Sequence, residues 1–141
     1  MSKSVLNVLV VDDDDVAAES VMRSLKKADV DCQVVVAQDG IDALEVLRGT
    51  SDRHIQRPFV ILLDLNMPRM NGFEFLEALR AESTLRDSIV FVLTTSDADS
   101  DRSRAYHEFI AGYMVKSSVG PQFSKLSRLL SEYASAIKLP D

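Results

Sequence analysis

The sequence predicts an α/β domain in which a five-stranded parallel sheet is covered by helices on both faces. Five short apolar segments alternate along the chain with stretches whose apolar residues recur every three or four positions. Strands that alternate with helices favour a parallel sheet, and nearly continuous apolar strands are typical of sheets buried on both faces. Because a barrel needs eight such units, the prediction is a doubly wound (βα)5 sheet.

The first strand and the first helix are separated by a run of four aspartates, Asp12 to Asp15. Residues 5–11 are almost continuously apolar, which suits a buried strand. Asp14 or Asp15 can cap the following helix, because a short acid accepts hydrogen bonds from the free backbone N–H groups at a helix start. The side of that helix predicted to face the core comprises Ala17, Ala18, Val21, Met22, Leu25 and Ala28.

The second strand is predicted over residues 33–37, and a turn at 38–40 leads into a short helix. Gly49 closes that helix, since glycine is common just past a helix end. Residues 50–57 are polar and charged, and predict an exposed loop that is long for an α/β connection. The third strand then covers residues 59–63.

The second half of the chain repeats the alternation with strands at 88–93 and 112–115. The first of its three helices is predicted from Phe73, Leu76 and Leu79, and Gly120-Pro121 opens the last. The second helix is predicted from Ala98, Arg102, Ala105, Tyr106 and Phe109. The apolar stripe of the last helix comprises Phe123, Leu126, Leu130, Tyr133 and Ile137, with Leu129 outside it and available for a homodimer contact.

Composition excludes several classes of protein. The chain has 141 residues, 46% of them hydrophobic, so one domain spanning residues 1–141 is expected. A formal net charge of −6 argues against direct binding to nucleic acid. The single cysteine, Cys32, excludes a disulfide framework and a thiolate zinc site. With no apolar run near ~18 residues and no signal-peptide core, a cytoplasmic protein with no membrane attachment is expected.

Polar residues stand at the ends of four of the five predicted strands. Asp12 and Asp13 follow the first, Asp64 the third, Thr94 the fourth and Lys116 the fifth. In a parallel sheet all carboxyl ends lie at one edge, which is where open α/β sheets bind their ligands. We therefore expect these residues, far apart in the sequence, to meet in one crevice.

Three carboxylates in one crevice repel each other. At about 4 Å and an effective dielectric near 20, each like-charged pair costs roughly 4 kcal/mol. A hard divalent cation with oxygen ligands relieves this repulsion, and Mg²⁺ is the expected ion. A nucleophilic carboxylate beside a metal ion, a hydroxyl and an ammonium group has the chemistry for phosphoryl transfer to aspartate.

Four motifs at strand ends carry a resemblance to a known family: VLVVDD, LLDLNMPRMNG, VLTTS and GYMVK. In this order they resemble the receiver domain of two-component response regulators, over the chain from Val5 to about Ile137. The resemblance implies a chemotaxis-type, single-domain receiver with the flavodoxin-like strand order 2-1-3-4-5. It also implies a phosphoprotein of a phosphorelay rather than an enzyme that acts on a separate substrate.

The resemblance also assigns the residues of an acceptor site. Asp64 matches the phosphoacceptor that takes its phosphoryl group from a sensor histidine kinase with Mg²⁺. Asp13 matches the direct metal ligand, and Asp12 matches its acidic neighbour, which usually acts through water. The backbone carbonyl of Asn66 matches the third protein ligand.

Further matches concern the switch that follows phosphorylation. Thr94 matches the switch hydroxyl, Lys116 the phosphate-binding lysine and Tyr113 the switch aromatic. Asn66 and Ser96 stand at the positions that tune hydrolysis in the family. The implied switch remodels the face formed by the fourth helix, the fifth strand and the fifth helix, for partner binding or phosphorelay.

Two features depart from the family pattern or leave its register open. Ser117 follows Lys116 where the family usually has proline after a cis bond, and a cis bond without proline costs about 2.5–4 kcal/mol. The bond between Lys116 and Ser117 can therefore be cis or trans. The run of four aspartates also allows a shift of one residue.

The long loop 50–57 resembles receivers paired with phytochrome-like histidine kinases, while the downstream protein partner is not indicated.

Three other functions remain as alternatives. The first is a receiver-like interaction module that is not phosphorylated. It is favoured by Ser117, which stands where the family usually has proline. The second is a phosphatase with an aspartyl nucleophile, although Asn66 lacks the acid that would protonate a leaving group. The third is a flavin- or nucleotide-binding module, but Asp12–Asp15 would repel the phosphate that such a module binds after its first strand.

Overall fold

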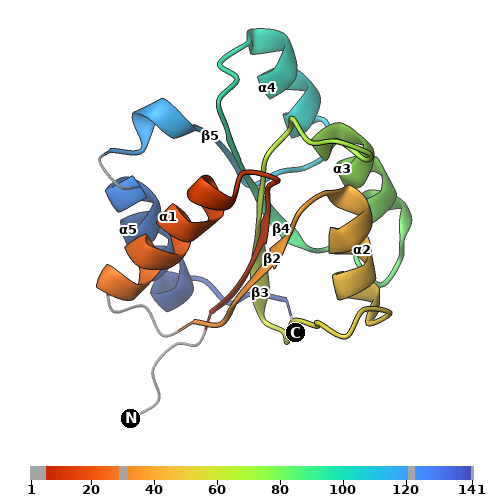
Figure 1. Ribbon diagram of the computed structural model, residues 1–141, viewed down its shortest axis with the longest axis horizontal. Coiled ribbons are helices and arrows are strands. Elements are labelled where there is room, and N and C mark those ends of the chain that lie inside the picture. The colour runs from red at the N-terminus through yellow and green to blue at the C-terminus, as the bar shows by residue number, and fades with distance from the viewer. Residues whose placement is uncertain (1–5, 29–31, 121–122, 141) are drawn as a thin grey trace.

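The computed structural model describes residues 6–28, 32–120 and 123–140. Its strands are β1 (Asn7–Val11), β2 (Val34–Ala37), β3 (Phe59–Leu63), β4 (Ile89–Thr94) and β5 (Gly112–Val115). They form one parallel sheet in the order β2-β1-β3-β4-β5 (Figure 1). The predicted doubly wound sheet with strand order 2-1-3-4-5 is confirmed.

Helices cover both faces of this sheet. On one face α1 (Asp15–Lys27) packs beside α5 (Ser124–Ala136), and on the other lie α2 (Gly40–Arg48), α3 (Gly72–Ala81) and α4 (Asp99–Tyr106) (Figure 1). A short 3-10 helix, η1 (Lys116–Ser118), follows β5. Within the described ranges, no helix combines the length and the apolar character needed to cross a bilayer.

The core has two layers because alternate residues of each strand point to opposite faces. In β1, Leu9 and Val11 pack into the layer below α2 and α3, whereas Val8 and Val10 pack into the layer below α1 and α5. Every residue of β1 and of β3 is buried. Their continuous apolar sequences reflect this burial on both sides.

Local capping signals fix the helix ends. The Asp14 carboxylate accepts hydrogen bonds from the backbone N–H groups of Val16 at 3.0 Å and Ala17 at 3.4 Å, so Asp14 is the cap of α1. Gly49 ends α2 in the left-handed conformation, at φ 74°. Both predictions made from sequence are confirmed. Asn71 begins α3 with a reciprocal capping box to Glu74.

Four large apolar residues that belong to the predicted helical patterns are exposed. They are Met22 (44% exposed), Tyr106 (47%), Phe109 (81%) and Ile137 (47%). Helix α4 ends at Tyr106, so Phe109 lies beyond the helix, at φ 60°, and leaves the helical spacing. Ile137 is the residue at which α5 ends.

The last helix begins later than predicted. It starts at Ser124 rather than at Gly120-Pro121, and Phe123, just before the helix, adopts a positive φ of 57°. Pro121 lies outside the described residues, as does Val5 at the start of the predicted first strand.

Arg80 of α3 connects two loops on the side of the sheet away from α1. Its Nε donates to the carbonyl of Glu108 at 2.7 Å, and one Nη donates to that of Phe109 at 3.0 Å. The other Nη donates to the carbonyls of Arg86 and Ser88, both at 2.8 Å. Burial lowers the pKa of Arg80. The connection between α4 and β5 is thereby fixed to the start of β4.

Candidate functional site

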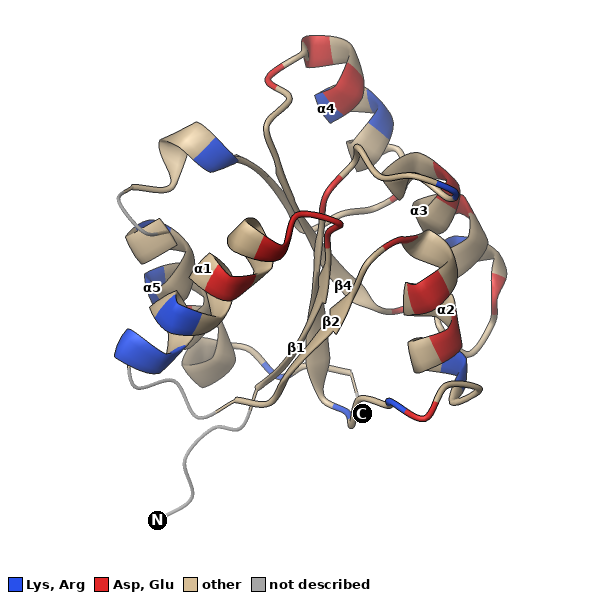
Figure 2. Ribbon diagram, viewed as in Figure 1, with Lys and Arg blue, Asp and Glu red and all other residues tan. Residues whose placement is uncertain are grey.

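The strand register sets Asp12 and Asp64 side by side. Val11 pairs with Leu63 at the ends of β1 and β3, and the backbone N–H of Asp64 donates to the carbonyl of Val11 at 2.9 Å. Each aspartate is the first residue past its strand. Figure 2 shows the resulting concentration of acidic residues at the carboxyl ends of the strands, where β1 leads into α1.

Three carboxylates meet at this edge. Asp12, Asp13 and Asp64 each offer an oxygen, and these oxygens lie within 4.8 Å of one another. Asp12 and Asp64 are buried, with 4% and 7% of their surface exposed, whereas Asp13 is exposed. The site therefore opens to solvent on the side of Asp13. A set of hard oxygen donors at this spacing fits a divalent cation such as Mg²⁺ or Mn²⁺.

Lys116 supplies the positive charge of the cluster. Its Nζ lies 2.9 Å from Oδ2 of Asp12 and 3.5 Å from Oδ2 of Asp64, and its side chain is only 13% exposed. Burial alone would lower the pKa of Lys116, but the hydrogen bond to Asp12 and the charges of both carboxylates outweigh it and raise that pKa. The lysine is therefore charged at neutral pH.

Asp12 remains electrostatically unfavourable in spite of this partner. Burial raises its pKa, and the hydrogen bonds from the backbone N–H of Asp14, at 2.9 Å, and from Lys116 offset only part of the effect. The charge of Asp64 raises the pKa of Asp12 further. One ammonium among three carboxylates leaves net negative charge, which a bound cation would neutralise.

The loop from β3 to α3 folds back tightly over Asp64. The backbone N–H of Asn66 donates to Oδ1 of Asp64 at 3.3 Å, and that of Gly72 donates to the carbonyl of Leu65 at 3.0 Å. A Cβ at Gly72 would lie 2.6 Å from the Asp64 carbonyl oxygen and 2.7 Å from the Cα of Leu65. Only glycine allows this approach. Asn66 itself is exposed beside the acidic cluster.

Thr94, Ser96 and Tyr113 form a neighbouring group of contacts at the ends of β4 and β5. Thr94 is fully buried, and its Oγ1 accepts a hydrogen bond from the backbone N–H of Ser96 at 3.5 Å. The Tyr113 hydroxyl donates to the carbonyl of Ser96 at 2.9 Å. Burial raises the pKa of Tyr113. The Ser96 hydroxyl donates to Asp101 of α4 at 2.6 Å, which links this group to that helix.

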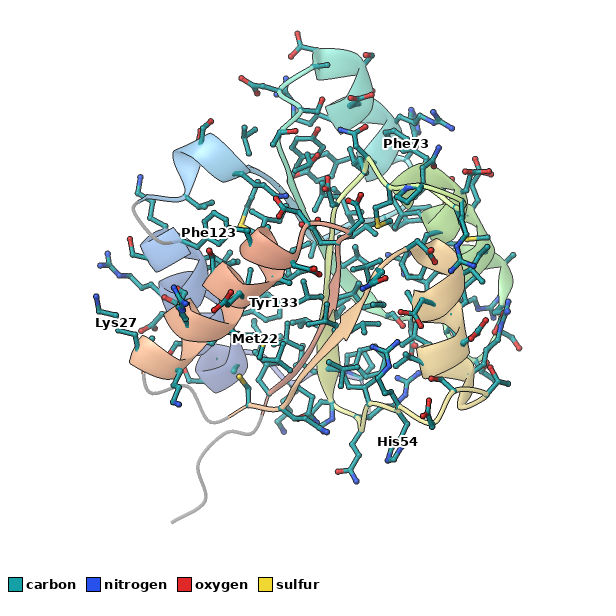
Figure 3. The ribbon with its side chains drawn as sticks, viewed as in Figure 1. Met22, Lys27, His54, Phe73, Phe123 and Tyr133 are labelled. Carbon is teal, nitrogen blue, oxygen red and sulfur yellow. The ribbon has the colours of Figure 1, made fainter. Side chains whose placement is uncertain are left out.

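Arg104 of α4 is a site residue that sequence reasoning did not identify. Its guanidinium stacks on the Phe73 ring, 4.1 Å from the ring centre, and Phe73 reaches from α3 toward α4 (Figure 3). Both residues line a hollow of about 530 Å³ that also includes Asp13 and Asn66. No spacing in the sequence indicates this contact, because the two side chains belong to different helices.

The pair formed by Asp39 and Arg69 was also not predicted. Asp39 lies at the carboxyl end of β2, where its side chain caps α2 and accepts a hydrogen bond from Arg69 Nε at 2.6 Å. The Asp-Gly dipeptide before α2 was a detectable capping signal, but the arginine partner lies 30 positions away.

The peptide bond between Lys116 and Ser117 is trans, because the only cis bond among the described residues joins Arg57 to Pro58. Lys116 starts η1 immediately after β5. The lysine thus reaches the carboxylates without the cis bond that is usual in the family that the sequence resembles.

Comparisons with known proteins agree on one family. A family model described as "Response regulator receiver domain" matches residues 8–126. Response regulator Rcp1 of Synechocystis is 29% identical over 135 residues, which are 94% of this chain and 92% of that protein. The phosphorylated cyanobacterial phytochrome response regulator RcpA matches with a TM-score of 0.84 and 28% identity, over 96% of this chain and 98% of the other. The Mn²⁺-bound form of Rcp1 matches with a TM-score of 0.81 and 27% identity, over 96% and 99%.

Proposed function

Because this chain belongs to the response regulator receiver domain family, we propose that it is a phosphorylation-switched signalling protein with Asp64 as its phosphoacceptor. One observation carries the proposal. The Asp64 carboxylate lies within 4.8 Å of oxygens of Asp12 and Asp13, and 3.5 Å from the Lys116 ammonium. A nucleophile, a cation site and a fixed positive charge are thereby combined at one strand end.

The cation in this proposal is Mg²⁺, held by Asp12, Asp13, Asp64 and the backbone carbonyl of Asn66. The oxygen donors of the cluster and the Mn²⁺-bound state of the related Rcp1 structure support this ion class. When bound, the ion neutralises negative charge on phosphoryl oxygens. Burial raises the pKa of Asp12 and the charge of Asp64 raises it further, and the ion relieves this second effect.

The remaining chemistry belongs to the residues of the chain. A carboxylate oxygen of Asp64 attacks the phosphorus of a phosphohistidine, and the bond from phosphorus to the kinase nitrogen breaks with its electron pair left on that nitrogen. Lys116 is close enough to hold a phosphoryl oxygen by a charge-assisted hydrogen bond, and the Thr94 hydroxyl binds another. Asn66 and Ser96 flank the approach of the water that later hydrolyses the acyl phosphate.

The output in this proposal runs through Thr94. Its Oγ1 accepts a hydrogen bond from Ser96, which also contacts Tyr113 and Asp101. A phosphoryl group that recruits the Thr94 hydroxyl would therefore displace Ser96, Tyr113 and the start of α4 together. The face formed by α4, β5 and α5 then changes its affinity for a downstream protein, for a phosphorelay partner or for a second copy of the chain.

Likeness to Rcp1 and RcpA supports a phytochrome-like histidine kinase as the phosphoryl donor. The match to Rcp1, which covers 92% of that protein, supports a function as a response regulator. The net charge of −6 supports protein partners rather than nucleic acid, and a cytoplasmic location suits such partners.

The test is covalent labelling of Asp64. Acetyl phosphate with Mg²⁺ is expected to add about 80 Da, the mass of a phosphoryl group, to the intact protein. Asp64→Asn should not gain this mass. Asp87→Asn is the matched control, because Asp87 precedes β4 at the opposite edge of the sheet, and it should be labelled like the wild type. Equal labelling of wild type and Asp64→Asn would contradict the proposal.

A second candidate is a receiver-like module that binds partners without being phosphorylated. It is favoured by Ser117, which replaces the usual proline, and by the position of Lys116 nearer to Asp12 than to Asp64. The labelling experiment separates the two candidates, since this one predicts no mass change in any variant.

A further inference from the structure

We infer that the ion pair between Asp39 and Arg69 holds the loop 65–71 in the conformation that binds the metal ion, so that both residues act as positioning residues for Mg²⁺. This inference rests on the proposed function, because it takes the Asn66 carbonyl as a metal ligand. Neither residue belongs to the acidic cluster, and the pair reaches the loop from the far side of β1.

Arg69 holds an unfavourable backbone conformation in this loop. Its φ of 62° lies in the left-handed region, which L side chains other than asparagine and aspartate rarely adopt. Strain of this kind persists only where surrounding contacts enforce it, and it is concentrated at functional sites. The loop conformation at Arg69 thus needs an external contact to maintain it.

Asp39 provides that contact from a rigid support. Its side chain is 5% exposed, and its Oδ2 accepts a hydrogen bond from Arg69 Nε at 2.6 Å. Its Oδ1 accepts one from the backbone N–H of Asp42 at 2.9 Å, which fixes the carboxylate at the start of α2. Burial alone would raise the pKa of Asp39, but these hydrogen bonds outweigh it and lower the pKa, so the partner of Arg69 is ionised.

A backbone contact beside the pair makes the attachment two-point. The N–H of Gly40 donates to the carbonyl of Met70 at 3.1 Å. The Met70 side chain lies so close that a Cβ at Gly40 would be 2.6 Å from its Cγ. Residues 69 and 70 are therefore fixed to the junction of β2 and α2 by a side chain and by the backbone.

The metal-binding part of the loop lies between this attachment and Asp64. At its near end, the N–H of Asn66 donates to Oδ1 of Asp64, and Gly72 N–H donates to the Leu65 carbonyl. An exposed loop held at both ends presents its carbonyl to the ion with little loss of freedom on binding. Without the attachment at residues 69 and 70, the ion itself would have to order the Asn66 carbonyl. Mg²⁺ would therefore bind more weakly.

The direct test compares Mg²⁺ affinity in two matched variants by isothermal titration calorimetry. Asp39→Asn keeps a good helix cap but loses the charge, and its dissociation constant for Mg²⁺ is expected to rise about tenfold, as for other outer partners of metal ligands. Asp42→Asn removes a different ion pair of α2, the one with Arg53. It leaves loop 65–71 attached, so its dissociation constant should equal that of the wild type.

A second variant separates positioning from general support of the fold. Arg69→Gly relieves the strain at φ 62°, which offsets the loss of the pair, so its stability should be close to that of the wild type while it binds Mg²⁺ about tenfold more weakly. The double variant should be no weaker than either single one, because both remove the same contact. In both variants the rate of labelling by acetyl phosphate should return to the wild-type rate at saturating Mg²⁺.

The outcomes are distinguishable. Mg²⁺ dissociation constants within twofold of wild type in Asp39→Asn and Arg69→Gly would overturn the inference alone. Weaker binding in both variants, with no labelling of wild type, would support the inference and contradict the phosphoacceptor function. A wild type that does not bind Mg²⁺ would overturn both.

Discussion

Lys116 donates a hydrogen bond to Asp12 at 2.9 Å, while its distance to Asp64 is 3.5 Å. The lysine thus partners the more deeply buried carboxylate in the structure. Even so, burial keeps the pKa of Asp12 above its ordinary value of 3.8. Without a bound cation, the buried negative charge of Asp12 therefore lowers the stability of the folded chain.

Replacement of Asp12 by asparagine is expected to stabilise the metal-free protein at pH 7 by about 1 kcal/mol. A raised pKa means that the folded state binds more protons than the unfolded state, so the stability of the wild type falls as pH rises from 3.8 through the folded pKa. Asparagine removes that loss. Urea unfolding with a chelator measures it, and the exposed Asp13→Asn is the control with a smaller effect. A less stable Asp12→Asn would contradict the explanation.

Asp39 is expected to give the stability of the protein the opposite dependence on pH. Its pKa is lowered from 3.8 in the folded state, so its contribution to stability is present above 3.8 and is lost as pH falls through the folded pKa. Asp39→Asn should therefore lose less stability on acidification than the wild type does. Urea unfolding at a series of pH values from about 5 to about 2 gives the difference between the two proteins. If the free energies of unfolding of the two proteins fall equally on acidification, Asp39 does not contribute to this pH dependence.

Tyr113→Phe should lower the free energy of unfolding by about 1 kcal/mol, the typical net value of one hydrogen bond. The phenylalanine keeps the ring but removes the donor to the Ser96 carbonyl. Labelling by acetyl phosphate should continue, because the hydroxyl contacts Ser96 rather than Asp64. Mass spectrometry beside urea unfolding tests both parts, and loss of labelling would place Tyr113 in the chemistry instead.

Gly72→Ala should destabilise the protein by about 2–4 kcal/mol and strongly reduce labelling. The added Cβ would meet backbone atoms of Asp64 and Leu65 at 2.6 and 2.7 Å, and these atoms cannot move without moving the phosphoacceptor. Gly49→Ala is the comparison. Gly49 has φ 74° but no atom within 4 Å of its ideal Cβ, so only conformational strain of about 1 kcal/mol is expected, with labelling intact. Similar effects of both substitutions would contradict the steric argument.

Phe109→Gly should stabilise the protein by about 0.5–1 kcal/mol, although it removes an aromatic side chain. That side chain is 81% exposed and its backbone stands at φ 60°, so little burial is lost and strain is relieved. Tyr106→Gly, three residues earlier at the end of α4, should instead cost about 1 kcal/mol of helix propensity. Thermal or urea unfolding of the two variants shows whether their effects have opposite signs.

The parts of the site that were predicted from sequence depend on two local facts and one rule of topology. Apolar runs that stop at Asp12 and Asp64 locate the strand ends, and a parallel sheet brings such ends to one edge. Contacts between distant side chains were not predictable in this way. Neither the pairing of Asp39 with Arg69 nor the stacking of Arg104 on Phe73 leaves a spacing in the sequence.

The errors in the fold have a similar cause. Helical spacing at Phe109 agreed with a continuing helix, but α4 ends at Tyr106, and the backbone turns where tertiary contacts to Arg80 hold the next carbonyls. The start of α5 was misplaced because Phe123, the first residue of the predicted apolar stripe, lies outside the helix in the left-handed conformation.

The contacts of Arg80 also determine how α4 can tilt. They hold the carbonyls of Glu108 and Phe109 just past its end, and the one buried residue of the helix, Ala105, lies near that end as well. At the other end, α4 contacts Ser96 through Asp101 and through the N–H of Ala98. The end of α4 near Arg80 is thus fixed, and the helix can tilt about that end. If Ser96 moves, the resulting shift of α4 would be largest at its first residue, Asp99, and would decrease toward the end of the helix that leads to β5.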